Sequence, residues 1–176
     1  MFFSDTVVRD AKVIDPAPHA DERGRFMRAW CSREFTENGI AFVPVQANMG
    51  YSRKKGTLRG MHFQREPAPE AKLVRCTRGV MFDVVVDLRP ESPTYRKWYG
   101  VELSAENGRM LYVPEYCAHG YQTLMDDTEM YYMTSAFYHP GAATGVRFDD
   151  PAFGVEWPVP ATVISDQDRS WPVIEA

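Results

Sequence analysis

The amino-acid sequence predicts an all-β protein, a double-sheet jelly roll or a β-barrel with one or two short helices. Three observations support this class. From residue 41 onward, short segments with strand character follow one another at close spacing. The 12 glycines and 13 prolines are spread along the whole chain, as turns between many short strands require. Helical patterning is almost absent, so strands must build the core.

Ten segments have the composition and alternation of β-strands, and each is bounded by turn residues. They span residues 6–14, 25–30, 42–48, 57–64, 72–77, 80–88, 97–103, 109–113, 117–125 and 128–137. The last two are expected to form a hairpin across Asp126-Asp127. Within residues 80–88 the even positions are apolar and share one face, whereas Asp83 and Asp87 share the other. Turns are expected at residues 19–24 and at Met49-Gly50.

Two regions depart from the strand pattern. Residues 32–39 are expected to form a short helix, with Ser32 as its N-cap and Gly39 as its stop. Residues 145–176 have little periodicity, and we expect them to wrap around the outside of the barrel.

Length and composition set the class of protein. At 176 residues the chain can bury one full core, so we expect one domain over residues 1–176. The net charge of −4 argues against a nucleic-acid-binding surface. The first eight residues lack a basic segment, and the most apolar run, at residues 80–88, is short and carries two aspartates. We therefore expect no signal peptide and no membrane span. Three widely spaced cysteines, Cys31, Cys76 and Cys117, fit reduced thiols in the cytoplasm.

The most informative stretch for chemistry is Thr57–Gln64. It places His62 near Arg59, and a Pro-rich loop at residues 65–71 then leads to Lys72. A lone histidine is more often a structural residue than a catalytic one. An imidazole between two fixed cations, however, has the surroundings of a proton acceptor for an anionic or enolisable ligand.

Several short motifs occur in a fixed order along the chain. They are Leu58–Gln64, Lys72–Cys76, Phe82–Arg89, Ser92–Thr94, Glu102–Asn107, Val113–Glu115, Ala118–Gly120 and Asp150-Pro151. In this order the chain closely resembles the dTDP-4-dehydrorhamnose 3,5-epimerase family from about Asp21 to Asp168. The resemblance implies a cupin-type jelly roll and a homodimer that exchanges N-terminal strands. It also implies an isomerase that acts on a nucleotide-diphosphate-linked 4-keto sugar without a cofactor or a metal.

The resemblance also implies a role for each matching catalytic position. His62 matches the general base of the family, and Asp168 matches the carboxylate that orients this base. Tyr132 matches the proton donor on the opposite face of the sugar, although Tyr131 is an adjacent rival that only the family register excludes. Lys72 matches the cation beside the C4 carbonyl.

Further positions match the family's substrate contacts. Arg59 and His119 match residues that line the pocket, and a structural role for His119 has similar weight. Tyr138 matches an aromatic residue beside the substrate. The positions that match contacts to the nucleotide and its diphosphate are Arg23, Gln46 and Asn48.

The chemistry explains why these groups are needed. A 4-keto sugar has acidic C–H bonds at C3 and C5, because the anion left behind delocalises onto the C4 oxygen. Epimerisation requires a base on one face, an acid on the other and a positive charge at the enolate oxygen. A histidine with its reference pKa of about 6.5 is partly neutral at pH 7, and a phenol with a reference pKa of about 10 is protonated. A buried carboxylate would fix the tautomer of the histidine.

Metal binding is not expected. Many cupins bind a metal through a His-x-His pair with a later Glu and a further His. The four histidines of this chain, His19, His62, His119 and His139, include no such pair, and position 64 is Gln. A site of three histidines stays open on sequence alone.

The chain departs from the family pattern at three places. Arg28 stands where the family has a glutamate in a region that contacts the nucleotide base, so we hypothesise a base other than thymine. The spacing from Gln46 to Arg59 is one residue longer, near Lys54-Lys55. Tyr116-Cys117 replaces the usual Gly-Phe, which is expected to reshape the sugar pocket.

The sequence leaves alternatives to a 3,5-epimerase. A 3-only or 5-only epimerase acting on a CDP- or GDP-linked sugar is the nearest. A metal-dependent cupin dioxygenase would require bound iron, and a non-catalytic sugar-binding cupin should have lost the base or the acid.

Overall fold

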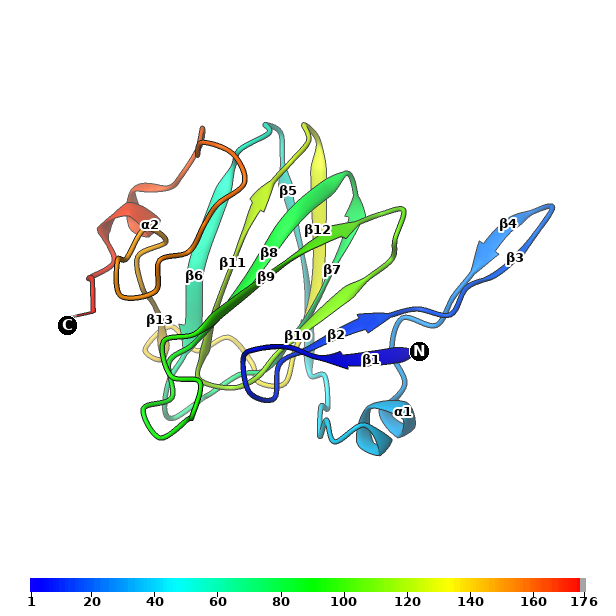
Figure 1. Cartoon of the computed structure of the whole chain (residues 1–176), viewed down its shortest axis with the longest axis horizontal. Helices are drawn as coiled ribbons and strands as arrows, with labels where there is room; N and C mark the ends of the chain where they lie inside the picture. The colour runs from blue at the N-terminus through cyan, green and yellow to red at the C-terminus, as the bar shows by residue number, and fades with distance from the viewer. Residues whose placement is uncertain (175–176) are drawn as a thin grey trace.

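The computed structural model describes residues 1–174, which fold around two antiparallel β-sheets packed face to face (Figure 1). The larger sheet has six strands in the order β1-β2-β10-β7-β12-β5, and the smaller has five in the order β13-β6-β11-β8-β9. Strands β3 and β4 form a separate two-stranded ribbon. The predicted all-β double-sheet class with two short helices is therefore confirmed.

The elements follow one another in this order. They are β1 (Phe2–Asp5), β2 (Lys12–Asp15), β3 (His19–Asp21), β4 (Gly24–Phe26), α1 (Ser32–Glu37), β5 (Gln46–Ser52), β6 (Leu58–Gln64), β7 (Lys72–Arg78), β8 (Val80–Asp87), β9 (Trp98–Ser104), β10 (Met110–Val113), β11 (Cys117–Thr123), β12 (Thr128–Thr134), β13 (Ala143–Gly145) and α2 (Asp166–Ser170).

Consecutive strands from β5 to β13 lie in opposite sheets, except for the β8–β9 pair, which is the connectivity of a jelly roll. The turn from β7 to β8 shows how short such a crossing can be. It needs only Gly79, which has a φ of +78°. A Cβ at this position would lie 2.6 Å from Thr128 Oγ1. Both the positive φ and this close contact therefore require a glycine.

The core between the sheets takes apolar side chains from both. Val74 and Leu111 come from the larger sheet, whereas Met81, Val85 and Leu103 come from the smaller one. All five residues are fully buried. Each such side chain contributes about 1.5–3 kcal/mol by leaving water.

The outer face of the smaller sheet is covered by the C-terminal segment. The even-numbered residues of β8, among them Val84 and Val86, pack there with Phe153 and Trp157, and the Trp157 ring meets Phe82 edge to face. Strand β8 is therefore buried on both sides. The prediction that the segment after residue 145 wraps the barrel is confirmed for its described part, and the segment lies beside β6 in Figure 1.

The N-terminal region carries an arm. Strands β3 and β4 extend away from the two sheets in Figure 1, and all six of their residues are exposed. Helix α1 returns the chain to the larger sheet, where Phe35 packs against Phe3 and Phe42.

Three predictions about strands were wrong. Residues 6–14 are not one strand, because Asp10 adopts a φ of +66° in a turn that folds β2 back on β1. Met49-Gly50 is not a turn, since β5 runs through it, and Gly50 instead makes room for the Tyr121 hydroxyl. Residues 117–125 and 128–137 do not form a hairpin, because β11 and β12 belong to different sheets.

Smaller corrections concern element ends. The N-cap of α1 is Cys31, one residue before Ser32, and it makes no side-chain capping bond. Gly39, with a φ of +77°, follows the helix as predicted. Pro44, which lacks an N–H, delays the start of β5 to Gln46. The expected turn at 19–24 contains β3, and only residues 25 and 26 of the segment 25–30 pair as a strand, in β4. Among residues 1–174, no helix has the length and apolar character needed to cross a membrane.

Candidate active site

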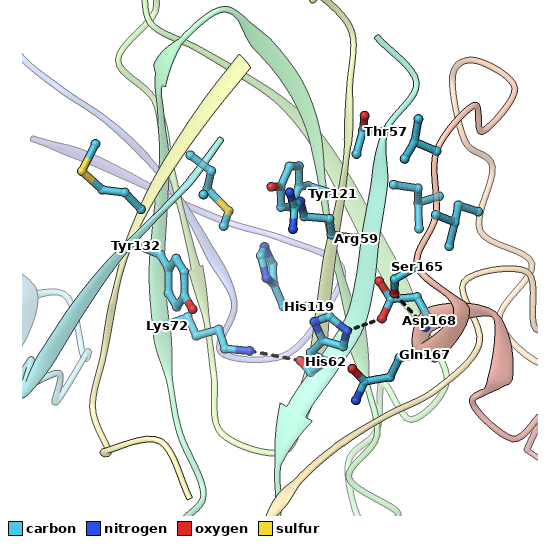
Figure 2. A pocket seen from close by; sticks show the side chains of 16 residues that line it. Thr57, Arg59, His62, Lys72, His119, Tyr121, Tyr132, Ser165, Gln167 and Asp168 are labelled. Carbon is cyan, nitrogen blue, oxygen red and sulfur yellow. Dashed lines mark hydrogen bonds and ion pairs between the residues drawn. The ribbon is translucent and has the colours of Figure 1, made fainter. Parts of the chain in front are cut away.

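Two adjoining cavities lie between the sheets, with volumes of about 590 and 300 Å³. We call them the larger and the smaller lobe. Four residues line both lobes: His62, Lys72, Tyr132 and Gln167. Figure 2 shows Tyr132 across the cavity from His62, with the Lys72 side chain extending between them. The structure therefore brings together three of the four predicted catalytic residues from β6, β7 and β12, and the fourth, Asp168, lines the larger lobe.

His62 is held by a buried carboxylate. Its Nε2 lies 2.6 Å from Asp168 Oδ1, and Asp168 is 4% exposed. Burial alone would raise the pKa of Asp168, but the His62 ring and the donors Gly60 N–H and Ser165 outweigh it, and the pKa lies below its usual value. The carboxylate is therefore ionised at neutral pH. Since Asp168 occupies Nε2, Nδ1 is the ring nitrogen left to take a proton.

Local sequence features place Asp168 beside His62. The Ser165 side chain caps α2 by accepting from the Asp168 N–H at 3.1 Å, which fixes the start of the helix. On β6, Gly60 donates its N–H to Asp168 Oδ2 at 3.3 Å. A Cβ at Gly60, whose φ is +127°, would lie 2.6 Å from Gly120 Cα on β11. Glycine is therefore required where β6 approaches both β11 and the carboxylate.

Lys72 is a nearly buried cation. Its side chain is 7% exposed, and its Nζ donates to the His62 carbonyl oxygen at 3.1 Å. It also lies 3.1 Å from Glu70 Oε1. An ammonium has three N–H donors, so donors remain for a ligand in the cavity.

Tyr132, rather than Tyr131, faces the cavity. It shares its face of β12 with the buried Met130 and packs against the inter-sheet core. Burial raises the pKa of Tyr132, and the negative charge of Glu70 and the Tyr121 hydroxyl raise it further. The phenol is therefore protonated over the whole neutral range and can donate a proton.

His119 has both of the roles that the sequence left open. Its Nε2 lies 2.8 Å from Asp83 Oδ1 on the neighbouring strand β8, and its ring lines the larger lobe. Asp83 is fully buried, and burial raises its pKa against the lowering effect of His119 and Lys72.

The predicted binding residues divide among three places. Arg59 lines the larger lobe, while Gln46, Asn48 and Tyr138 line the smaller one. Arg23 is not brought to either lobe of its own chain: it lies in the turn of the arm, paired with Asp21.

The positions that depart from the family pattern also lie outside the lobes. Arg28 pairs with Glu34 at 2.6 Å at the base of the arm. Lys54 and Lys55, near the extra residue, lie in the exposed turn between β5 and β6. Tyr116 lines a separate outer groove, and Cys117 is part of the core. Neither residue lines a lobe, so the expectation that Tyr116-Cys117 reshape the sugar pocket stays a prediction.

Three residues of the site were missed from the sequence: Glu70, Asp83 and Gln167. Glu70 precedes Lys72 by two positions, a spacing that places both on one side of a strand and could have indicated the pair. Asp83 is on the same strand face as the core residue Val85, where an unpaired carboxylate would be costly. Among the described residues, no three His, Cys, Asp or Glu side chains are grouped in a way that could hold a metal ion.

Comparison with known proteins identifies the family. The model of the dTDP-4-dehydrorhamnose 3,5-epimerase family matches residues 5–176. An enzyme of that name from Sinorhizobium fredii is 44% identical over 173 residues, which cover 98% of this chain and 89% of the relative. The structure of the Bacillus anthracis enzyme, solved with TDP and PPi bound, superposes with a TM-score of 0.94 at 37% identity and covers 98% of this chain and 99% of that one.

A structure with lower sequence identity shows that this fold also carries a related but different epimerisation. ChmJ, a 3'-monoepimerase from Streptomyces bikiniensis solved with dTDP-quinovose, has a TM-score of 0.86 and 33% identity, covering 94% of this chain and 84% of its own. The full-length match to the family model and the 44% identity confirm both the resemblance and the predicted class of enzyme. The chain belongs to the dTDP-4-dehydrorhamnose 3,5-epimerase family.

Proposed function

We propose that this protein inverts C3 and C5 of dTDP-4-dehydro-6-deoxyglucose through an enolate at C4. The observation that carries the proposal is the placement of a base and an acid on opposite sides of one cavity. The His62–Asp168 pair lies on the smaller sheet side, Tyr132 lies on the larger sheet, and the Lys72 ammonium lies between them.

Each inversion is a pair of proton transfers. Nδ1 of His62 takes the proton from C5, and the electron pair of that C–H bond forms the C4–C5 double bond while charge moves to the C4 oxygen. Lys72 donates an N–H to this oxygen. The Tyr132 hydroxyl then delivers its proton to the opposite face of C5, and solvent restores both side chains. The same set acts at C3. Positioned proton transfer supplies about 10²–10⁴ in rate.

The two lobes accommodate the two parts of the substrate. The sugar lies where the four shared residues meet, because the reacting carbons must touch both His62 and Tyr132. The nucleotide diphosphate extends along residues that present N–H donors, with Arg59 on one side and Gln46 and Asn48 on the other.

We further propose that the active form is a homodimer in which the arm of each copy supplies Arg23 to the cavity of the other. Two features support this. Arg23 is on an exposed arm away from its own cavity, and a row of exposed apolar residues that includes Met49 and Tyr51 runs along the edge strand β5. A second copy that covers this row would remove apolar surface from water.

Mixed dimers test the shared site. Arg23→Ala and His62→Asn proteins should each be inactive, whereas their co-expression should restore activity, because one site of the mixed dimer then has both residues. A lack of rescue in a confirmed dimer would show that Arg23 does not act across subunits.

The nucleotide is tested directly. Turnover of dTDP-, CDP- and GDP-linked 4-keto-6-deoxyglucose in deuterated water, followed by NMR, should show deuterium at C3 and C5 and a preference for the dTDP form. This preference would overturn the hypothesis that Arg28 changes the base selected, and a preference for CDP or GDP would support it. Fractionation of the source cells should recover the protein in the cytoplasm, where nucleotide sugars are made.

A 3-only epimerase is the second candidate, and the likeness to the 3'-monoepimerase ChmJ favours it over a 5-only enzyme. Deuterium at C3 alone, with no exchange at C5, would establish it.

A further inference from the structure

Glu70 has no part in the proton transfers, yet its carboxylate lies inside the site. Its side chain is 11% exposed, and Oε1 lies 3.1 Å from Lys72 Nζ. It lines the smaller lobe together with Lys72 and Tyr132. A carboxylate is rarely so buried unless it is paired, and this one pairs with the cation that faces the C4 oxygen.

The contact restricts the direction of the Lys72 ammonium. A lysine ends a flexible four-carbon chain whose head group can take many positions. Here the ammonium donates an N–H to the His62 carbonyl oxygen and forms an ion pair with Glu70 Oε1, and these two partners lie on different segments of the chain. The two contacts together hold the ammonium at a place where Lys72 lines both lobes, and it keeps N–H donors for a ligand.

The same carboxylate acts on the phenol of Tyr132. Burial is the main reason that the pKa of Tyr132 is raised, and the charge of Glu70 is the next. The other titratable groups that line the two lobes are Arg59 and His62 from β6, Lys72 from β7, His119 and Tyr121 from β11, Tyr138 and Asp168. Asp168 and the neighbouring Asp83 each have a histidine partner, so Glu70 is the carboxylate among these described groups whose charge reaches both the lysine and the phenol.

We infer that Glu70 is a positioning residue of the epimerase site: its carboxylate holds the Lys72 ammonium toward the substrate oxygen, and its charge also acts on Tyr132, which lines the same lobe. This inference rests on the proposed function, because it assigns Tyr132 the role of the acid. The negative charge of Glu70 opposes formation of the enolate. This cost is offset because Tyr132 stays protonated and the Lys72 ammonium stays in place.

The substitution Glu70→Gln separates charge from structure. The Gln side chain keeps an oxygen that can accept from Lys72 but has no negative charge. We expect kcat at pH 7 to fall by about fivefold, since a neutral oxygen replaces the negative charge that is paired with the Lys72 ammonium. The alkaline limb of the kcat profile should move down by about one pH unit, the lower end of what a neighbouring charge does to a pKa. Glu70→Asp, which keeps the charge, should leave the limb nearer to that of wild type.

Glu66→Gln is the matched control. Glu66 is in the same loop, but it is exposed and accepts a hydrogen bond from Tyr116 outside both lobes. This variant should have the wild-type pH profile. An equal loss of kcat at every pH in Glu70→Gln, or an unchanged alkaline limb, would overturn the inference, because either result is what a purely structural residue gives.

A second readout does not depend on turnover. The ¹³Cζ resonance of Tyr132, assigned with Tyr132→Phe, should titrate about one pH unit lower in Glu70→Gln than in wild type. If the wild-type protein epimerised none of the nucleotide sugars but this shift were present, the proposed function would fail while the action of Glu70 on Tyr132 would stand. If turnover were normal and the shift absent, the inference on Glu70 would fail alone.

Discussion

Replacing Asp168 by Asn tests how the base is prepared for proton abstraction. Asp168 Oδ1 accepts from His62 Nε2 at 2.6 Å and from Trp171 Nε1 at 3.3 Å, while Oδ2 accepts from the Gly60 N–H. Both oxygens therefore face donors. An Asn must turn its NH₂ group toward one side or the other. Toward His62, it forces the ring proton onto Nδ1, the atom that should accept the substrate proton. If the NH₂ group turns toward Gly60, it faces the Gly60 N–H, and two donors then meet without an acceptor.

The size of the effect follows from these contacts. Either orientation also removes the negative charge that stabilises the imidazolium, and a charge-assisted hydrogen bond contributes about 1.5–3 kcal/mol. Loss of the correct tautomer as well costs about 10⁴ in kcat in a Ser-His-Asp triad. We therefore expect Asp168→Asn to lower kcat by about 10²–10⁴, or about 3–5 kcal/mol in the barrier.

The assay is the rate of deuterium incorporation at C3 and C5 of the dTDP-linked 4-keto sugar, with thermal unfolding as a check of the fold. Asp166→Asn is the control, since Asp166 is exposed on the same helix, and it should leave kcat within about twofold. A rate for Asp168→Asn within about threefold of wild type would refute the assignment of the carboxylate as the residue that orients the base.

Three further predictions follow from the same geometry. Lys72→Ala should lower kcat by about 10²–10³ through loss of the donor to the enolate oxygen, measured by the same exchange assay; an unchanged kcat would exclude that role. Tyr132→Phe should form product about 10²–10⁴ more slowly while deuterium still enters with retention of configuration, because His62 can return a solvent-derived proton to the face it took it from; Tyr131→Phe should behave as wild type. Asp87 has a pKa of about 2, since hydrogen bonds from Arg89, Ser92 and Thr94 outweigh the effect of burial. Its ionised form should therefore add about 2 kcal/mol to the free energy of unfolding above pH 4, and the gap between wild type and Asp87→Asn in urea titrations should close as the pH falls from 4 to 2.

The sequence was sufficient for the fold class, and it indicated most of the residues that the structure brings together at the cavity, for physical reasons. Alternation along residues 72–88 reveals strands directly, and the His62 and Lys72 motifs are local. Asp168 is 106 positions from His62, and only the family register connected them.

Features that depend on tertiary packing could not be predicted from the sequence. The turn prediction at Gly50 failed because the sequence does not distinguish a glycine that bends the chain from one that makes room for the Tyr121 side chain. The hairpin prediction failed because a short loop such as Asp126-Asp127 can join strands of one sheet or of two. Glu70 was part of a polar loop in the sequence, and only the fold buries it against Lys72. Arg23 matches a substrate-contact position in the family register, and only the fold shows that it lies on an arm away from the cavity of its own chain.

The measurement that tests the central claim most directly is solvent deuterium incorporation into dTDP-4-dehydro-6-deoxyglucose by the wild-type protein, by His62→Asn and by His139→Asn, an exposed histidine outside both lobes. Incorporation at C3 and C5 by the wild type and by His139→Asn, and its loss in a folded His62→Asn protein, is the predicted result. Undiminished exchange in His62→Asn would contradict the account, because the base would then lie elsewhere.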